Sequence, residues 1–370
     1  MTDKKNPQKR PAFHGSDIEQ IERCYGIPKE NIIRFGANVN PLGLSPSLRE
    51  KLSANLDVIT CYPDRDYKSL RKVIARYCHT DMNYVVTGNG STELISLLIS
   101  QRNARHALVI GPTYSEYERE LSLTGGRISN YYLKETADFL LDIEDLKHAL
   151  EKDVDFLILC NPNNPTSSAL NRKELEAVLD ECRKRNIFVM IDETYVEFAP
   201  SIEEITAMPF VPDYNNLMVL RGVSKFFASP GLRLGYGITS NQEFLTTLKK
   251  HQNPWSLNSI GAYAGELMLQ DTDYIRETRR LISSERERCL HTLEGCRYAK
   301  VYPSYGNFIL VKICKEGMDS FTIFEHAIRQ GLMIRDCSSF EGLPGEYIRF
   351  CIMKPEDNTK LLRCLGELLS

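Results

Sequence analysis

Residues 217–235 read Leu217-Met-Val-Leu-Arg-Gly-Val-Ser-Lys225-Phe-Phe-Ala-Ser-Pro-Gly-Leu-Arg233-Leu-Gly235. The apolar run at the start predicts a buried strand, and the residues after it predict a tight loop that carries Lys225. Placing an ammonium group among apolar side chains costs on the order of several kcal/mol unless it is neutralised, paired or bonded covalently. A desolvated lysine has a lowered pKa, and its free amine can form a Schiff base with an aldehyde. The alternative is a surface lysine at the start of a helix.

Length and charge restrict the class of protein. A chain of 370 residues is too long for one simple core and predicts about two domains. The net charge of -3 and the isoelectric point near 6.2 leave no basic face for nucleic acid and no acidic tail. We therefore expect a small-molecule partner.

The cysteines and the hydropathy pattern indicate the cellular compartment. The eleven cysteines lack C-x-x-C pairs and zinc-like Cys/His spacing, which predicts free thiols in a reducing cytoplasm and no structural metal. The N-terminus has no apolar signal core, and no run of about 18 apolar residues occurs. We therefore expect a soluble, cytoplasmic protein that does not associate with membranes.

From residue 84 onward, short apolar runs alternate with amphipathic runs, which is typical of β/α units and a mainly parallel sheet. The predicted strands end at Thr87, Ile110, Leu133, Cys160, Ile191 and Leu220. A mostly helical stretch from Pro254 to Leu293 follows, with Gly261 and Gly265 as its only internal breakers, and we expect it to bridge two domains. A smaller α/β part completes the chain, with predicted strands at 307–311, 333–336 and 347–351 and predicted helices at 321–330 and 355–369.

Chemically active side chains directly follow the predicted strands. Ligands of open α/β sheets bind at the carboxyl ends of the strands. The residues at these positions are Gly90, Ser91, Thr92, Tyr114, Asn164, Asp192, Tyr195 and Lys225. The glycine turn and helix start at Gly90 favour an anion site, and Arg233 offers a fork of donors suited to phosphate. No G-x-G-x-x-G opens a helix and no G-x-x-x-x-G-K occurs, which argues against dinucleotide-binding and P-loop enzymes.

Other polar residues leave two interpretations open. His14 precedes a predicted helix cap and is a loop residue in the simpler interpretation. Asn38 and Asn40 lie in a turn-rich segment, where turn formation is favoured over ligand binding. Arg335 and Arg349 lie in predicted strands, either as solvated surface arginines or as an anion clamp.

In its order and spacing, one set of residues resembles the fold-type I pyridoxal-phosphate enzymes, in their class I/II aminotransferase branch: Asn164-Pro165-Thr166, Asp192, Tyr195, Ser224-Lys225 and Arg233. The resemblance spans nearly the whole chain. It implies a large, mainly parallel α/β/α sheet domain and a smaller C-terminal α/β domain. We expect residues 1–54 to form an N-terminal arm and part of the small domain, residues 55–254 the large cofactor-binding domain, and residues 255–370 an interdomain helix and the small domain.

Within that branch the chain looks most like two sister groups, the histidinol-phosphate aminotransferases and the L-threonine-O-3-phosphate decarboxylases of cobalamin synthesis. The marks shared with both are Asn40 to Gly43, Tyr62-Pro63-Asp64, Gly88 to Ser91, Arg335 and Arg349. The decarboxylases are favoured by His14-Gly15 followed by Ile18, by the run Asn38 to Gly43 and by His251 to Ser256.

The resemblance implies a role for each of these residues. Lys225 would bond to pyridoxal 5'-phosphate, and Asp192 would keep the pyridine nitrogen protonated so that the ring accepts electrons from the substrate α-carbon. Tyr195 and Asn164 would bond the ring hydroxyl, and Tyr114 would stack on the ring. The cofactor phosphate would be bound by Gly90, Ser91, Thr92, Ser224, Arg233 and, from the neighbouring subunit of a homodimer, Tyr62.

The resemblance also implies a substrate. A doubly anionic amino acid would be held by His14, Asn38, Asn164, Arg335 and Arg349. The favoured reaction is that of a lyase, the decarboxylation of L-threonine O-3-phosphate to (R)-1-amino-2-propanol phosphate. Histidinol-phosphate aminotransferase is the second choice, and an enzyme for another phospho- or phosphono-amino acid or amine is the third. A regulatory protein that merely keeps the fold fits less well, because such proteins commonly lose the lysine or the aspartate.

Two positions depart from the family pattern. Ser167 follows Asn-Pro-Thr where glycine is usual, and we expect a local adjustment of the turn rather than a lost activity. Gly222 stands where a hydroxyl residue is common, which removes one possible phosphate ligand and predicts weaker cofactor binding.

Overall fold

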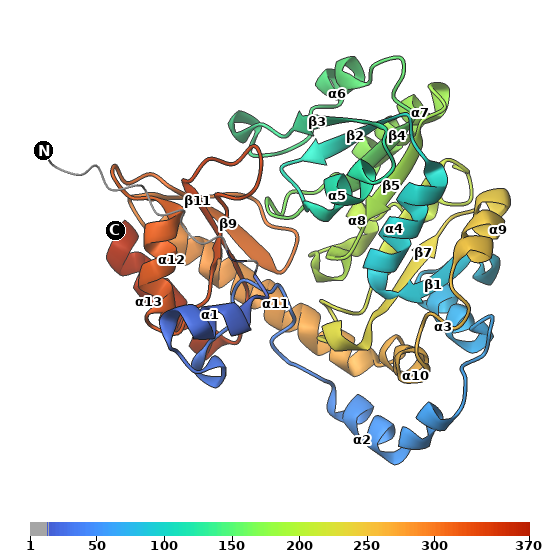
Figure 1. Ribbon diagram of the computed structural model, residues 1–370. Helices are drawn as coiled ribbons and strands as arrows, with labels where there is room; N and C mark the ends of the chain where they lie inside the picture. Colours follow the sequence, from blue (N-terminus) through green and yellow to red (C-terminus); the bar gives the residue numbers. More distant parts are fainter. Residues whose placement is uncertain (1–12, 14) are drawn as a thin grey trace, which may run out of the picture.

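The structure, a computed structural model, describes residue 13 and residues 15–370. It contains a seven-stranded sheet with the strand order β1-β7-β6-β5-β4-β2-β3 and a four-stranded sheet with the order β10-β11-β9-β8 (Figure 1). The strands of the large sheet are β1 (Val85–Asn89), β2 (His106–Gly111), β3 (Arg127–Tyr132), β4 (Phe156–Cys160), β5 (Phe188–Asp192), β6 (Leu217–Gly222) and β7 (Leu234–Ile238).

The large sheet is mainly parallel, as predicted. Strands β2 to β6 pair in parallel, and β7 runs antiparallel between β1 and β6. Strands β4, β5 and β6 are buried over their whole length, as expected for parallel strands covered on both faces. Because β1, β2, β4, β5 and β6 all point the same way, their carboxyl ends meet at one edge of the sheet.

Helices surround the large sheet. They are α2 (Pro46–Ala54), α3 (Lys68–Tyr77), α4 (Gly90–Arg102), α5 (Glu116–Ser122), α6 (Ile143–Ala149), α7 (Arg172–Lys184), α8 (Ile202–Ile205), α9 (Gln242–His251) and α10 (Ser259–Met268). The N-terminus of α4 directly follows β1, which directs its first turn toward the edge where the strands end.

The small sheet has its own core. It consists of β8 (Ala299–Val301), β9 (Phe308–Ile313), β10 (Arg335–Asp336) and β11 (Tyr347–Cys351), all antiparallel. Its apolar core includes α12 (Ser320–Ile328), α13 (Pro355–Leu369) and α1 (Ile18–Tyr25). Phe13 and Phe35 of the N-terminal segment belong to the same core. The domain limits at residues 54 and 254 stay a prediction.

One long helix, α11 (Thr272–Glu294), runs between the two sheets (Figure 1). Its residue Ile282 packs into the large core, whereas Leu293 packs into the small core. The predicted role of Gly261 and Gly265 as helix breakers is wrong, because both lie inside α10 and the helix ends only after Met268. A Cβ atom at Gly265 would lie 2.3 Å from the Cδ2 atom of Leu234, so this glycine allows α10 to approach β7 closely.

All eleven cysteines carry free thiols. Among residue 13 and residues 15–370, no helix is both long and apolar enough to cross a membrane.

A buried acidic group lies just after β5. Glu197, in the short 3-10 helix Val196–Phe198, is fully buried. Within the described part of the chain, neither of its carboxylate oxygens has a hydrogen-bond partner. The nearby Glu193 instead pairs with Arg221 at 2.7 Å. Burial raises the pKa of Glu197 to about 7.

This pKa predicts a stability change with pH. Because the folded-state pKa exceeds the ordinary value of about 4.3, stability is lost as the pH rises through 7. Glu197→Gln should therefore raise the free energy of unfolding at pH 8 by about 2–3 kcal/mol and change it little at pH 4.5. Urea unfolding of the cofactor-free protein at both pH values measures this. Glu176→Gln, on the exposed face of α7, is the control, and equal effects of Glu197→Gln at both pH values would contradict the prediction.

Candidate active site

A cavity of about 300 Å³ opens where the strands of the large sheet end. The predicted site residues in its wall are Asn38, Ser91, Thr92, Tyr114, Asn164, Asp192, Tyr195, Ser224, Lys225, Arg233 and Arg349. Gly90 lies just behind this wall, because a Cβ atom there would be 2.4 Å from the Nη2 atom of Arg233. A second cavity of about 250 Å³ also contains Tyr114, Asn164 and Arg349, and adds Arg335. The fold thus gathers predicted residues from both sheets in one place.

Lys225 lies in the loop after β6. Its Nζ atom donates a hydrogen bond to the carbonyl oxygen of Ala37 at 2.8 Å. Burial, together with the cations of Arg349 and Arg233, lowers the pKa of this amine to about 8. A larger fraction of the amine is therefore neutral and nucleophilic near neutral pH than for an exposed lysine.

Asp192 ends β5 and is held by three donors. Its Oδ2 atom accepts a hydrogen bond from the Tyr117 hydroxyl at 2.6 Å. Its Oδ1 atom accepts from the backbone nitrogen of Thr194 at 2.9 Å and from the Thr194 hydroxyl at 2.5 Å. These bonds fix the orientation of a buried carboxylate in the cavity wall, where it can pair with a cationic group of a ligand.

The start of α4 forms an anion-binding corner of the cavity. Gly90 has a φ of +81°, and Ser91 and Thr92 of the first helical turn lie in the cavity wall. The first turn of a helix presents unpaired N–H groups and the positive end of the helix dipole. The guanidinium of Arg233 lies against Gly90, so a fixed positive charge adds to these donors. A phosphate group suits this corner.

Two arginines of the small sheet face the same space. Arg335 of β10 lies directly opposite Arg349 of β11 in the antiparallel pairing of these two strands. The Arg349 side chain is buried and donates to the Oδ1 atom of Asn164 and to the carbonyl oxygen of Gly36. Its Nε atom has no partner among the described residues, and Arg335 donates to the Ser339 hydroxyl at 2.7 Å. Since neither arginine forms an ion pair with a carboxylate of the described chain, the two charges favour an anionic ligand.

The two asparagines of the N-terminal segment differ in their surroundings. Asn38 has a φ of +55°, lines the cavity and donates to the Tyr195 hydroxyl at 3.4 Å, and its Oδ1 atom has no partner among the described residues. Asn40 is a structural residue, because its Nδ2 atom donates to the carbonyl oxygen of Phe226 at 2.7 Å and to the Thr278 hydroxyl at 2.8 Å. The sequence favoured turn formation for both asparagines. For Asn38 this is only part of the explanation, because its side chain also lines the cavity.

Among the described residues, Tyr62 is a predicted site residue that does not line either of these two cavities. Tyr62 is 82% exposed, and its ring lies 5.1 Å from that of Trp255 in a different part of the surface. A contact of Tyr62 with the cofactor of a neighbouring subunit stays a prediction. His14 lies outside the described residues.

The structure adds two residues that the sequence did not predict. Tyr117 follows Tyr114 by one helical turn, and their rings meet edge to face at 5.6 Å. Thr194 follows Asp192 by two residues, a spacing at which a hydroxyl can bond the aspartate side chain. Both spacings are visible in the sequence. Neither identifies a site residue by itself, because its meaning depends on Asp192 being part of the site.

The two departures from the family pattern have structural explanations. Ser167 adopts a φ of +60°, so the serine takes up the left-handed backbone itself. Gly222 ends β6 in tight pairing with β7, and a Cβ atom there would be 3.2 Å from the carbonyl oxygen of Leu234. A larger residue at position 222 would crowd this strand. Weaker cofactor binding stays a prediction.

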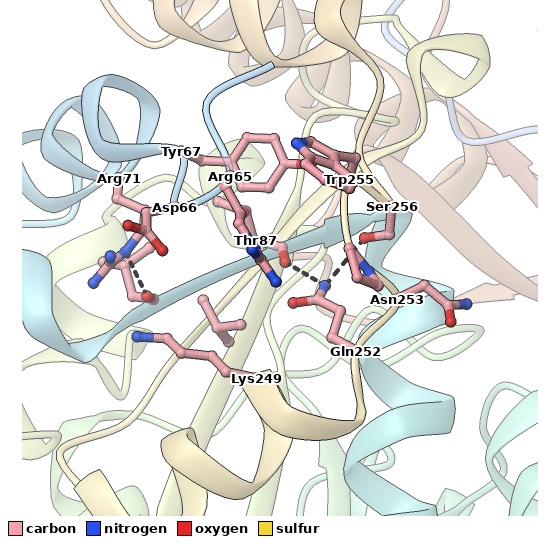
Figure 2. Close-up of a pocket in the computed structure, with 13 residues that line it drawn as sticks. Arg65, Asp66, Tyr67, Arg71, Thr87, Lys249, Gln252, Asn253, Trp255 and Ser256 are labelled. Carbon is pink, nitrogen blue, oxygen red and sulfur yellow. Dashed lines mark hydrogen bonds between the residues drawn. The ribbon is translucent and has the colours of Figure 1, made fainter. Parts of the chain in front are cut away.

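A separate hollow lies beside the edge strand β1 (Figure 2). Gln252 and Arg71 cover this edge, because they donate to the carbonyl oxygens of Thr87 and Val85. The Ser256 hydroxyl donates to the carboxylate of Glu93, next to the anion-binding corner. Five residues of the segment from His251 to Ser256 that favoured the decarboxylases line this hollow and not the active-site cavity: Gln252, Asn253, Pro254, Trp255 and Ser256.

Comparison with known proteins shows the family. The family model described as aminotransferase class I and II matches residues 30–365. The chain belongs to this family. Class I and II aminotransferases use pyridoxal 5'-phosphate. The fold of this chain is the fold-type I fold of these enzymes, with a large, mainly parallel sheet domain and a small second domain.

Members of the aminotransferase class I and II family match over most of their length. The threonine-phosphate decarboxylase of Salmonella typhimurium is 34% identical over 97% of both chains. The crystal structure of the histidinol-phosphate aminotransferase from Clostridium acetobutylicum is 32% identical, with a TM-score of 0.85, and covers 90% of this chain and 98% of its own. The histidinol-phosphate aminotransferase from Sinorhizobium meliloti, solved in complex with pyridoxal-5'-phosphate, shares the fold at 22% identity and a TM-score of 0.83, covering 100% and 98%.

The cavity of this aminotransferase-family chain fits the cofactor. A nucleophilic amine, a fixed buried carboxylate and an anion-binding helix start line one cavity, as an aldehyde, a pyridine nitrogen and a phosphate group require. Moreover, any side chain at Gly90 would collide with Arg233, so the bare backbone keeps the corner open for a phosphate.

The same corner yields a testable prediction. A Cβ atom at Gly235 would lie 2.2 Å from the backbone nitrogen of Ser91, so Gly235→Ala must displace the first turn of α4. We expect this change to weaken binding of pyridoxal phosphate by about 10- to 100-fold, as measured by absorbance titration of the cofactor-free protein. Gly231→Ala is the control, because a Cβ atom there meets nothing within 4 Å. Equal cofactor affinity in both variants would contradict the prediction.

Proposed function

We propose that the protein is a pyridoxal-phosphate-dependent lyase that decarboxylates a doubly anionic amino acid, most specifically L-threonine O-3-phosphate to (R)-1-amino-2-propanol phosphate. The observation that carries this proposal is the pairing of Arg335 with Arg349 beside the cavity of Lys225. Two adjacent arginines, neither of which forms an ion pair with a carboxylate of the described chain, suit a substrate with a carboxylate and a phosphate.

In this proposal the cofactor would supply, when bound, an aldehyde for the substrate amine and a ring able to accept the electron pair left at the α-carbon. Asp192 would hold the proton on the pyridine nitrogen, Tyr195 and Asn164 would form hydrogen bonds with the ring hydroxyl, and Tyr114 would stack on the ring. Gly90, Ser91, Thr92, Ser224 and Arg233 would bind the phosphate. The ammonium form of Lys225 would deliver the proton that replaces the carboxylate at the α-carbon, and the neutral amine left behind would take up a proton from solvent.

The reaction depends on which bond to the α-carbon lies perpendicular to the ring. Arg349, with Asn164 on one side and Gly36 on the other, is fixed where it can hold the substrate carboxylate. Arg335 then takes the phosphate, and Asn38 and His14 complete the enclosure. Small displacements of the carboxylate decide between loss of carbon dioxide and loss of the α-hydrogen.

The comparisons support this reaction and also the second candidate. The relative from Salmonella typhimurium, 34% identical, carries the name threonine-phosphate decarboxylase. The related structure from Clostridium acetobutylicum is that of a histidinol-phosphate aminotransferase, so this activity is the alternative. A transaminase or decarboxylase for another phospho- or phosphono-amino acid or amine is the third candidate. We further propose that the enzyme works in the cytoplasm, where its free thiols stay reduced.

Two parallel assays separate the candidates. The holoenzyme is mixed with L-threonine O-3-phosphate, and separately with histidinol phosphate and 2-oxoglutarate. Release of carbon dioxide from the first mixture, without any keto acid, is the expected result. Glutamate formation in the second mixture, with no carbon dioxide from the first, would replace the proposal by the aminotransferase.

We also propose a homodimer with active sites at the interface. Three apolar residues close together in sequence are strongly exposed, Leu56 at 55%, Ile59 at 61% and Tyr62 at 82%, and the Tyr62 ring contacts Trp255, itself 42% exposed. A contiguous apolar surface of this kind is typical of an interface, and from it Tyr62 can reach the partner's cofactor phosphate.

The dimer can be tested by an interface charge. Ile59→Asp should raise the dimer dissociation constant at least about 100-fold and lower activity in parallel, because a carboxylate would be buried in an apolar interface. Sedimentation and activity at the same protein concentrations measure this. Leu123→Asp is the control, since Leu123 is also exposed, at 71%, but lies at the C-cap of α5. A fully active monomer would refute the proposal.

A further inference from the structure

Ser167 makes a hydrogen-bond junction between the two sheets. Its hydroxyl accepts a hydrogen bond from the backbone nitrogen of Gly306 at 2.9 Å and lies 3.1 Å from the hydroxyl of Ser304. The Ser304 hydroxyl already donates to the carbonyl oxygen of Phe308 at 2.7 Å. The proton in the Ser167–Ser304 bond therefore comes from Ser167, and each hydroxyl both donates and accepts one hydrogen bond.

The backbone of Ser167 joins the same junction. Its carbonyl oxygen accepts from the backbone nitrogen of Tyr305 at 2.9 Å, and its own N–H donates to the carbonyl oxygen of Asn163 at 2.8 Å. Ser167 is fully buried. A left-handed φ is unfavourable for a residue with a Cβ atom, so the hydroxyl contacts offset a cost that glycine would not have at this position.

The junction lies between the two halves of the active site. Three residues before Ser167, Asn164 lies in the cavity wall and accepts a hydrogen bond from Arg349. On the other side, residues 304–306 lead into β9. This strand pairs with β11, which carries Arg349. Arg286 of α11 holds the same segment, because its Nε and Nη2 atoms donate to the carbonyl oxygen of Gly306.

We propose that Ser167 is a positioning residue. Its hydroxyl sets the distance between the loop after β4, which carries Asn164, and the arginines of the small sheet. It touches neither substrate nor cofactor. Loss of the hydroxyl loosens the 304–306 segment and β9–β11 behind it, so Arg349 no longer meets the substrate carboxylate in register with Asn164. Cofactor binding is spared, because Lys225, Asp192 and the start of α4 belong to the large sheet.

The neighbouring serine provides a matched control. Ser168 is also buried in the same loop, but among the described residues its hydroxyl forms a hydrogen bond only with the Thr166 hydroxyl, at 2.8 Å, within the loop. Ser167→Ala and Ser168→Ala therefore each remove one buried hydroxyl, and only the first removes contacts between the sheets. Ser167→Gly additionally relieves the left-handed backbone, which separates the loss of the hydroxyl from strain.

The first test is hydrogen exchange measured by mass spectrometry on the three cofactor-loaded variants. In Ser167→Ala and Ser167→Gly, peptides covering residues 302–308 and 335–351 should exchange at least about tenfold faster than in the wild type, and in Ser168→Ala they should not. This measurement needs no substrate and does not depend on the proposed reaction. Equal exchange in the Ser167 and Ser168 variants would overturn the inference.

The second test rests on the proposed function and uses whichever of L-threonine O-3-phosphate and histidinol phosphate the wild type converts. Ser167→Ala and Ser167→Gly should raise KM about tenfold with cofactor affinity within about twofold of the wild type, whereas Ser168→Ala should change neither. A wild type that converts neither compound would refute both named reactions and leave the exchange test to decide on Ser167. Unchanged KM in both Ser167 variants of an active enzyme would overturn the inference.

Discussion

Lys225→Ala should abolish turnover and, at the same time, make the cofactor-free protein more stable near neutral pH. The loss of turnover should reach about 10⁴-fold or more, because the variant lacks the amine that we propose bonds the cofactor and delivers the proton to the α-carbon. The gain in stability follows from the pKa of about 8. Since this value lies below the ordinary value of about 10.4, the native state loses stability as the pH falls through 8, and removing the amine should recover about 1–3 kcal/mol at pH 7.

Three measurements check this result. Borohydride reduction of the holoenzyme followed by peptide mapping should find the pyridoxyl group on Lys225. Urea unfolding of the cofactor-free proteins should show the gain at pH 7 and its disappearance near pH 10. Lys250→Ala, an exposed lysine of α9, should behave as wild type in every assay. Unchanged activity in Lys225→Ala would instead support a binding protein that only keeps the fold.

Much of the fold follows from local patterns. The limits of β4, β11 and α13 agree with the predicted ranges. The continuous apolar run of β4 and the Pro-initiated amphipathic run of α13 have clear ends. Strand β7 was not predicted, since Gly235 and Gly237 interrupt its apolar pattern. Glycine is required at these two positions because of residues that are distant in the sequence. Cβ atoms there would collide with Ser91 and Met218. The sequence alone does not show such collisions.

The site was predictable where chemistry and strand ends coincide. Lys225 and Asp192 are polar residues at the ends of buried strands, and the topology then carries them to one edge. The orientation of Asp192 was not predictable, because it depends on a hydrogen bond from Tyr117 of helix α5, which is distant in the sequence. Ser167 was expected to adjust a turn, and its contacts with Gly306 are visible only once the two sheets are packed together.

Arg349→Ala should reduce kcat/KM for the substrate by a factor that corresponds to about 2–5 kcal/mol. The buried guanidinium has no carboxylate partner in the described chain, and its Nε atom is unpartnered. A substrate carboxylate can satisfy this fork with two parallel hydrogen bonds, which alanine cannot replace. We therefore expect the main effect in KM, with an additional loss in kcat because the substrate is no longer held with the reacting bond perpendicular to the ring.

Steady-state kinetics of three variants measure the contribution of the fork. Arg349→Lys keeps the charge but loses the bidentate geometry, so its kcat/KM should lie between those of the wild type and Arg349→Ala. Arg363→Ala, at an exposed position of α13, should have no effect. If Arg349→Ala left KM and kcat/KM unchanged, the substrate carboxylate would have to bind elsewhere, and the pairing of Arg335 with Arg349 would lose its proposed role. A lysine variant as impaired as the alanine variant would show that the direction of the donors, more than the charge, selects the bond that breaks.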